Sequence, residues 1–149
     1  MANVNSPNGF TPAYHMSGGT IRPSEFAIAS GTNASIFSGD VVNLSSGLVI
    51  QGTATGAPLG VFAGVEYQAT DGSVVFSKVW TADVATLGAA NAKAYVYSDP
   101  DIVYEAQSTG TPTQASIGTT NTISTTAGDS NTGRSKEGVT TTTSSGIAT

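Results

Sequence analysis

The chain has 149 residues, of which 38% are apolar and 10% charged, and it carries a formal net charge of −5 without a single cysteine. The length suits one domain, and no stretch approaches the roughly 20 apolar residues of a membrane-spanning helix, so we expect a soluble protein that does not enter a membrane. Without cysteine the chain can form no disulfide, no thiolate metal site and no cysteine nucleophile.

Residues 1–24 lack the pattern of a helix or of an inner strand. Prolines and glycines recur among them and fix or loosen the backbone too often for regular structure. The start has neither the basic stretch nor the apolar run of a secretory signal. Apolar side chains are spaced irregularly along this segment, at Phe10, Tyr14, Met16 and Ile21. We therefore predict an extended N-terminal arm whose apolar side chains enter pockets on a neighbouring protein.

Residues 25–107 consist of short apolar runs separated by turn residues, which is typical of an all-β sandwich or barrel. The first expected strands lie at 26–29, 41–44 and 48–50. The clearest hairpin follows, because the Asp-Gly pair at 71–72 supplies the positive φ that a tight turn needs. It joins a strand with Val61, Ala63, Val65 and Tyr67 on one face to a strand at 74–80.

The rest of this region continues the β pattern. Residues 82–91 contain weak helix formers and predict a loop with at most one helical turn. Strands at 93–97 and 102–107 flank a turn in which Pro100 has a suitable fixed φ. The predicted fold is therefore all-β, a compact β-sandwich or β-barrel of about seven or eight short strands.

The C-terminal segment, residues 108–149, is half Ser and Thr and has few large aliphatic side chains. Their burial cannot offset the cost of ordering the backbone, at roughly 1 to 2 kcal/mol per residue. Thr-rich sequence is nonetheless compatible with an extended strand that adds to the sheet edge of a partner. We predict a C-terminal arm that becomes ordered only in an assembly.

Few side chains suit catalysis or metal binding. His15 is the only histidine, so one chain cannot form a catalytic triad or a His-rich metal site, and we expect a hydrogen-bonding or packing contact there. Asp99, Asp101 and Glu105 miss the spacing of a calcium loop and predict a turn with solvated carboxylates. We therefore predict no catalytic residue, no cofactor and no metal.

The charge distribution argues against nucleic acids. Residues 25–107 contain eight acids and only two lysines, Lys78 and Lys93, and such a surface repels phosphate. A carbohydrate-binding module or small hydrolase stays open as an alternative. Its aromatic platform would come from Tyr67, Trp80, Tyr95 and Tyr97, and its carboxylates from Glu66, Asp71, Asp83 or Glu105.

Several motifs resemble a group of structural proteins of tailed bacteriophages, and together they cover most of residues 7–107. They are PNGFTP at 7–12, His15 with SGG at 17–19, FAIASG at 26–31, IFSGDVV at 36–42, GVFAGV at 60–65, FSKVW at 76–80 and AYVYSDP at 94–100. The GDVV and GVFAGV motifs also resemble head decoration (cement) proteins. Members of this group usually continue past the Thr-rich stretch into another strand-bearing segment, which this sequence lacks.

The resemblance implies a non-enzymatic capsid decoration protein of the virion, made in the host cytoplasm and bound to the outer surface of the capsid. Its partners would be the major capsid protein and copies of itself, as a homo-oligomer. The expected contact residues are Phe10, Tyr14 and Met16, with Arg22 available to a carboxylate on the shell. A phage tail or fibre protein remains a second possibility, because a β-core with a Thr-rich extension would serve it equally well.

Overall fold

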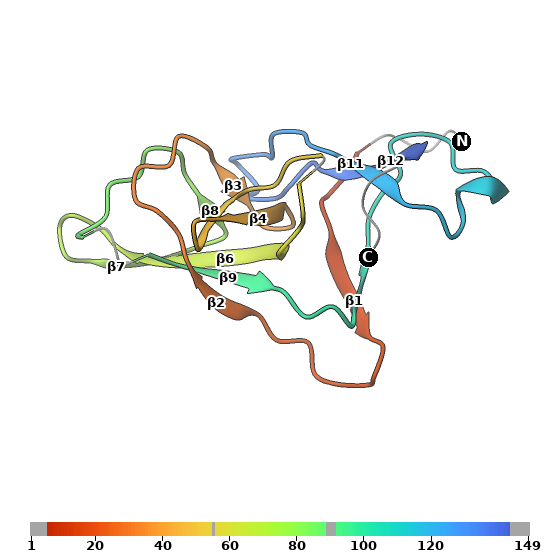
Figure 1. Cartoon of the computed structure of the whole chain (residues 1–149). Coiled ribbons are helices and arrows are strands. Elements are labelled where there is room, and N and C mark those ends of the chain that lie inside the picture. The colour runs from red at the N-terminus through yellow and green to blue at the C-terminus, as the bar shows by residue number, and fades with distance from the viewer. Residues whose placement is uncertain (1–5, 55, 89–91, 144–149) are drawn as a thin grey trace.

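The computed structural model describes residues 6–54, 56–88 and 92–143 and shows an all-β protein built from several sheets (Figure 1). Its strands are, in chain order, β1 Thr11–His15, β2 Ser24–Ala27, β3 Ile36–Phe37, β4 Val41–Ser45, β5 Leu48–Gln51, β6 Gly60–Gln68, β7 Val74–Ser77, β8 Val79–Trp80, β9 Ala92–Tyr97, β10 Ile102–Glu105, β11 Asn121–Ser124 and β12 Gly138–Thr143. A single 3-10 turn, η1, spans Gln114–Ser116.

The main sheet has six strands in the order β2-β9-β6-β4-β5, with β7 paired to the end of β6. Along β9, Ala92, Ala94 and Val96 are buried and Lys93 is exposed, so one face of the sheet lies against the core and the other faces outward. The sheet curls until Val49 of β5 forms one parallel bridge with Ile28, just beyond β2. It does not close into a barrel.

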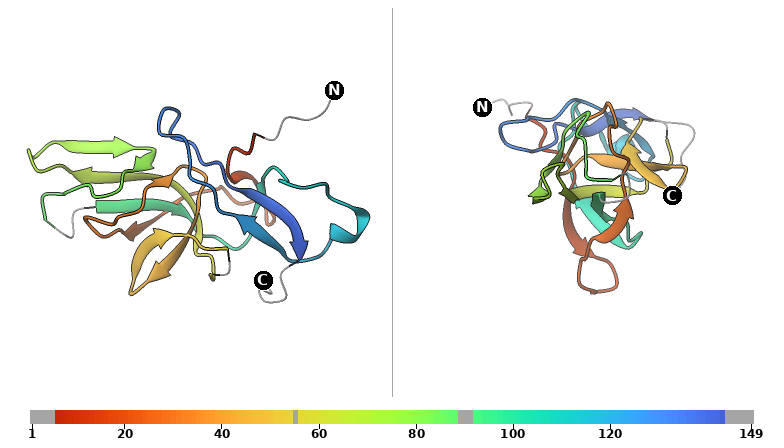
Figure 2. Two further views of the ribbon diagram at one scale, coloured as in Figure 1. Left: turned by 90° about the horizontal axis from the view of Figure 1, so that it is seen from above. Right: turned by 90° about the vertical axis from the view of Figure 1, so that its left-hand side faces the viewer.

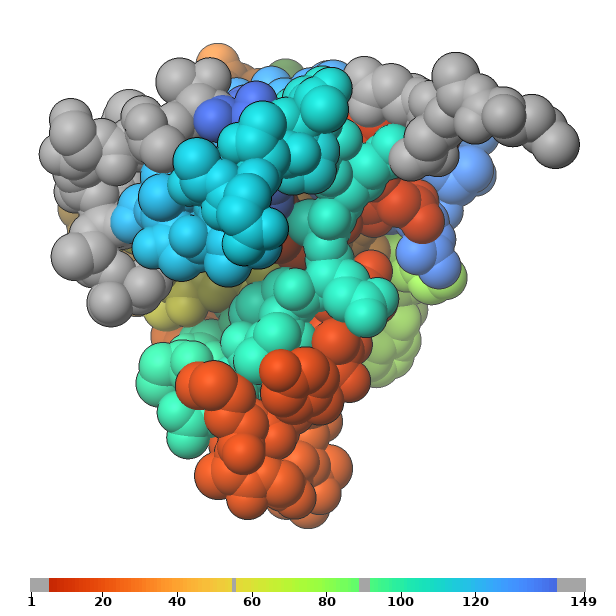
Figure 3. Space-filling view, turned by 90° about the vertical axis from the view of Figure 1, so that its right-hand side faces the viewer, coloured from red at the N-terminus to blue at the C-terminus, as the bar shows by residue number. Residues whose placement is uncertain are grey.

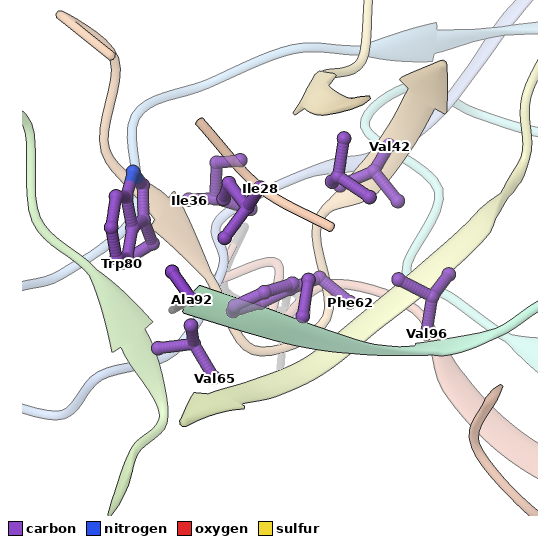
Figure 4. Packing of buried hydrophobic residues seen from close by; sticks show 10 residues of the cluster. Ile28, Ile36, Val42, Phe62, Val65, Trp80, Ala92 and Val96 are labelled. Carbon is purple, nitrogen blue, oxygen red and sulfur yellow. The ribbon is translucent and has the colours of Figure 1, made fainter. Parts of the chain in front are cut away.

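The short β3–β8 pair covers the inner face of this sheet and completes the core. Trp80 of β8 is fully buried, and its ring meets Tyr67 of β6 edge-on, with the ring centroids 5.5 Å apart. The indole N–H donates a hydrogen bond to the Thr32 hydroxyl, 2.6 Å away. Figure 4 shows Trp80, Ile36 and Ile28 facing side chains of the main sheet. The cluster consists of Ile28, Ile36, Val42, Val49, Phe62, Val65, Trp80, Ala92, Ala94 and Val96.

The predicted hairpin is confirmed, with differences in detail. Gly72 has φ +87° and β7 pairs antiparallel with β6. However, the strand expected at 74–80 is divided at Lys78, because β8 leaves β6 to pair with β3. A bulge between Phe62 and Gly64 turns Phe62 toward the core, so neither Val61 nor Ala63 shares the inner face with Val65 as we expected.

The strand count is higher than the sequence predicted. Among the described residues of 24–107 there are nine strands, β2 to β10, against the seven or eight expected. The difference comes from the two-residue strands β3 and β8, which are too short to show a hydrophobic period. In the segment 82–91, the described residues 82–88 form turns and no helix, and residues 89–91 lie outside the described residues.

The two terminal segments also form strands. β1 lies outside the main sheet and pairs antiparallel with β10, with Thr11 opposite Glu105 and His15 opposite Ile102. Farther along, β11 and β12 form an antiparallel hairpin beside β1 (Figures 1 and 2). The proposed arm boundaries at residues 24 and 108, and ordering of the tail only in an assembly, stay predictions.

Candidate functional site

The last two residues of β1 and the loop that joins β1 to β2, together residues 14–23, project from the body, and we call this projection the contact loop (Figures 1 and 3). Tyr14 and Met16 are large apolar side chains at its start, and 60% and 64% of their surfaces are exposed. Arg22, near its end, is also exposed, and no ion pair within the described part of the chain holds it. The structure thus brings three of the four predicted contact residues onto one projection.

The fourth residue, Phe10, lies elsewhere. Its backbone N–H donates to the Gly39 carbonyl at 2.9 Å, which ties the start of β1 to the turn before β4. Its half-buried ring lines a groove of about 450 Å³ on the chain's own surface. The groove is largely apolar, and its wall includes Val61, Ile102, Tyr104 and Ile123 from the three strands β6, β10 and β11. Phe10 therefore packs against the chain's own strands, whereas Tyr14 and Met16 are exposed to solvent.

The base of the contact loop is held by His15, the last residue of β1. Its Nε2 lies 3.1 Å from Oδ2 of Asp99, and its Nδ1 lies 2.9 Å from the Ser17 hydroxyl. The Met16 N–H donates to the Asp101 carbonyl at 2.8 Å. The hydrogen-bonding contact predicted for His15 is thus confirmed. It fixes where the projection leaves the body.

The same residues form a compact group of possible metal ligands. One ligand atom each from His15, Asp99 and Asp101 lies within 4.8 Å of the others. The Asp101 backbone N–H, followed by His15, keeps the pKa of Asp99 below its usual value, so this carboxylate is ionised at neutral pH. One imidazole and two carboxylates could hold a divalent cation with water completing the shell, but their existing hydrogen bonds already account for the arrangement.

A second polar cluster, which sequence reasoning missed, lies inside the molecule. Asp40 and Glu137 are each only 1% exposed, although they come from the turn before β4 and from the Thr-rich tail. Glu137 Oε2 accepts a hydrogen bond from the Val41 N–H, and Asp40 Oδ2 accepts one from the Phe37 N–H, both at 2.8 Å. Ser135, also buried, accepts the Glu137 N–H on its hydroxyl.

Burial controls the charge of these two carboxyls. Burial raises the pKa of Glu137 to about 8, and the nearby Asp40 charge adds to the rise, while the Val41 N–H opposes it. Burial also raises the pKa of Asp40, against hydrogen bonding from Ser135 and Phe37. Glu137 is therefore protonated at neutral pH. Asp40 and Glu137 are 97 positions apart in the sequence, and no local motif indicates that they lie close together. The sequence therefore offered no signal for this cluster.

The residues proposed for a carbohydrate site have structural roles instead. Trp80 is fully buried in the core, so its use as a sugar platform was wrong. Glu66 accepts a hydrogen bond from the Tyr95 hydroxyl at 2.7 Å. The Asp71 carboxylate accepts from the N–H and the hydroxyl of Ser73 and thereby closes the β6–β7 turn. The carbohydrate alternative thus loses its central aromatic residue.

Comparison with known families, curated proteins and solved structures found no match to this chain. Among the described residues there is also no helix of the length and apolar character that crossing a bilayer would require. We therefore infer a function from the exposed residues of the molecule itself.

Proposed function

We propose that this protein is a non-enzymatic virion structural protein, a decoration or cement protein that binds the outer surface of a phage capsid and stabilises the head. The observation that carries the proposal is the contact loop. It places Tyr14 and Met16 in solvent on a projection whose base is fixed by the His15–Asp99 contact. Exposed aromatic and Met side chains are favoured at protein interfaces, and a fixed base lowers the entropy lost on binding.

In this proposal the core is a compact sandwich, with the β3–β8 pair packed on the main sheet, and the two terminal segments act as arms. Both segments offer surfaces beyond the main sheet: the first carries the contact loop, and the second carries the β11–β12 hairpin. Spreading contacts over such extensions lets a small protein reach the roughly 2,000 Å² or more that permanent assemblies bury. Arg22 would pair with a carboxylate of the major capsid protein.

The first test is stoichiometric. Quantitative mass spectrometry of purified virions that carry this chain should give a copy number close to that of the major capsid protein. A handful of copies per virion would contradict the proposal and favour a tail or fibre protein.

The second test concerns the contact loop. We expect the double substitution Tyr14→Ser and Met16→Ser to abolish binding to undecorated heads in a co-sedimentation assay while leaving the folded core unchanged. Leu44→Ser is the matched control, because Leu44 is 44% exposed and lies on β4, outside both terminal segments. Equal binding by the double variant and the control would show that the contact loop is not the capsid interface.

A further inference from the structure

Strand β7 forms an edge of the main sheet and has an unusually apolar outer surface. It pairs only with β6 among the described strands, and it lies at the margin of the sheet in Figure 2. Val74 and Phe76 are 58% and 71% exposed, and both point to the outer face, since Val75 and Ser77 alternate inward. Proteins commonly protect such edges with charges or proline, and neither occurs within β7.

The direction of the backbone groups along β7 can be deduced from its contact with β6. A Cβ placed on Gly64 would lie 3.0 Å from the Ser77 carbonyl oxygen, so this carbonyl points toward β6. Because N–H and C=O directions alternate along a strand, the groups of Val75 also point toward β6. Those of Val74 and Phe76 therefore point away from the sheet. The exposed edge thus offers two residues with both a donor and an acceptor free for another strand.

We propose that this edge pairs, antiparallel and about a twofold axis, with β7 of a second copy of the chain. The inference deepens the proposed function, which includes contacts between copies, by naming the surface that makes them. The strand complements itself: when Val75 lies opposite Val75 of the second copy, Phe76 lies opposite the second copy's Val74, and the outward backbone groups face one another. Each of these two symmetric cross-strand pairs joins an aromatic to a β-branched side chain, a favourable combination.

Charge favours the same register. This register places Lys78, which is exposed just after β7, opposite Gly72 of the second copy. Lys78 therefore lies beside Asp71 of that copy. The Ser73 side chain and then its N–H keep the pKa of Asp71 below its usual value, so the carboxylate is ionised. Glu66 lies in the same row of the sheet as Phe76, but its carboxylate accepts from the Tyr95 hydroxyl of β9, on the side of β6 away from the junction, and the same row holds the neutral Gln68 in the second copy. No like charges meet in this arrangement.

The register can be tested by cysteine cross-linking, because the chain has no cysteine of its own. In the proposed pairing the two Val75 residues form a non-hydrogen-bonded pair, with Cβ atoms about 5 Å apart, whereas the two Val74 residues lie diagonally, about 7 to 8 Å apart. We expect Val75→Cys to give a disulfide-linked dimer under mild oxidation, and Val74→Cys to give severalfold less. Equal cross-linking of the two variants, or none in either, would overturn the pairing.

The interface itself can be tested by sedimentation velocity of the full chain over about a hundredfold concentration range. A four-residue strand pair is small, so we expect weak, concentration-dependent dimers that Phe76→Lys abolishes and Ile117→Lys leaves intact. A wild-type chain that stays monomeric throughout, or a Phe76→Lys variant that dimerises equally well, would overturn the proposal. Head binding by the wild-type chain separates the two proposals, because a wild-type chain that stays monomeric and still binds heads contradicts only the pairing of β7.

Discussion

Glu137 is the residue whose charge state most affects this fold. Its pKa is about 8 in the folded chain, above the ordinary value of 4.5, so between these values the folded state binds more protons than the unfolded state. The free energy of unfolding should therefore be highest at low pH within this window and fall as pH rises toward 8, by at most about 1.4 kcal/mol per pH unit. Urea denaturation at a series of pH values measures this slope.

Glu137→Gln removes the titration while keeping an oxygen that can accept from the Val41 N–H. We expect the stability of this variant to depend less on pH than that of the wild type between about 5 and 8. Glu105→Gln is the matched control, because Glu105 is exposed on β10. If both variants follow the wild-type pH profile, the burial of Glu137 does not control stability.

Thr32 gives a second prediction at the residue scale. Its hydroxyl accepts the hydrogen bond of the buried Trp80 indole and donates to the Ala29 carbonyl. Thr32→Val keeps the shape but leaves a buried N–H without a partner, which should lower the free energy of unfolding by about 1 to 3 kcal/mol. Thr119→Val, at an exposed threonine, should change it by less than about 0.5 kcal/mol. Equal effects of the two substitutions would mean that the indole finds another acceptor.

At the scale of elements, the His15–Asp99 contact should control how firmly β1 and the contact loop are held. We expect His15→Ala to speed hydrogen exchange of the Met16 amide severalfold, because that amide bonds to Asp101 beside the lost contact. Ser17→Ala removes only the hydroxyl contact of Nδ1, leaves the Ser17 N–H that donates to the same atom, and should have a smaller effect. Unchanged exchange of the Met16 amide in the His15 variant would show that the pairing of β1 with β10 alone holds the contact loop in place.

The elements also show what sequence can and cannot predict. The turn made by Asp71 and Gly72, and the strand expected at 93–97, depend on local stereochemistry and residue preference, so their prediction was sound. The two-residue strands β3 and β8 and the bulge at Ala63 exist only because distant segments pack there, and local patterns do not encode them. Of the predicted contact residues, Phe10 differs because its ring lies in a groove that five strands, β4, β6, β9, β10 and β11, line together.

At the scale of the whole molecule, the question is whether the Thr-rich tail packs against the β-core in the isolated chain. Counting aliphatic side chains argues against it, because too few are present to offset the ordering of the backbone. That count omits polar contacts. Three backbone hydrogen bonds join the tail to other segments. The Ser135 N–H donates to the Ser38 carbonyl at 3.0 Å, the Ser38 N–H donates to the Gly133 carbonyl at 3.2 Å, and the Gly9 N–H donates to the Glu137 carbonyl at 3.2 Å. These bonds, with the buried Glu137 side chain, fasten the tail to the core and to the N-terminal segment.

Hydrogen exchange of the isolated full-length chain decides between these arguments. If the polar contacts suffice, the amides of Gly9 and Ser135 should exchange as slowly as those of β9, while amides near η1, where the side chains are exposed, exchange fast. Raising the pH toward 8 should selectively weaken the protection of Ser135, because Glu137 must then ionise in a buried site. Exchange of Ser135 as fast as near η1 at every pH would mean that the tail takes its position only when a partner holds it.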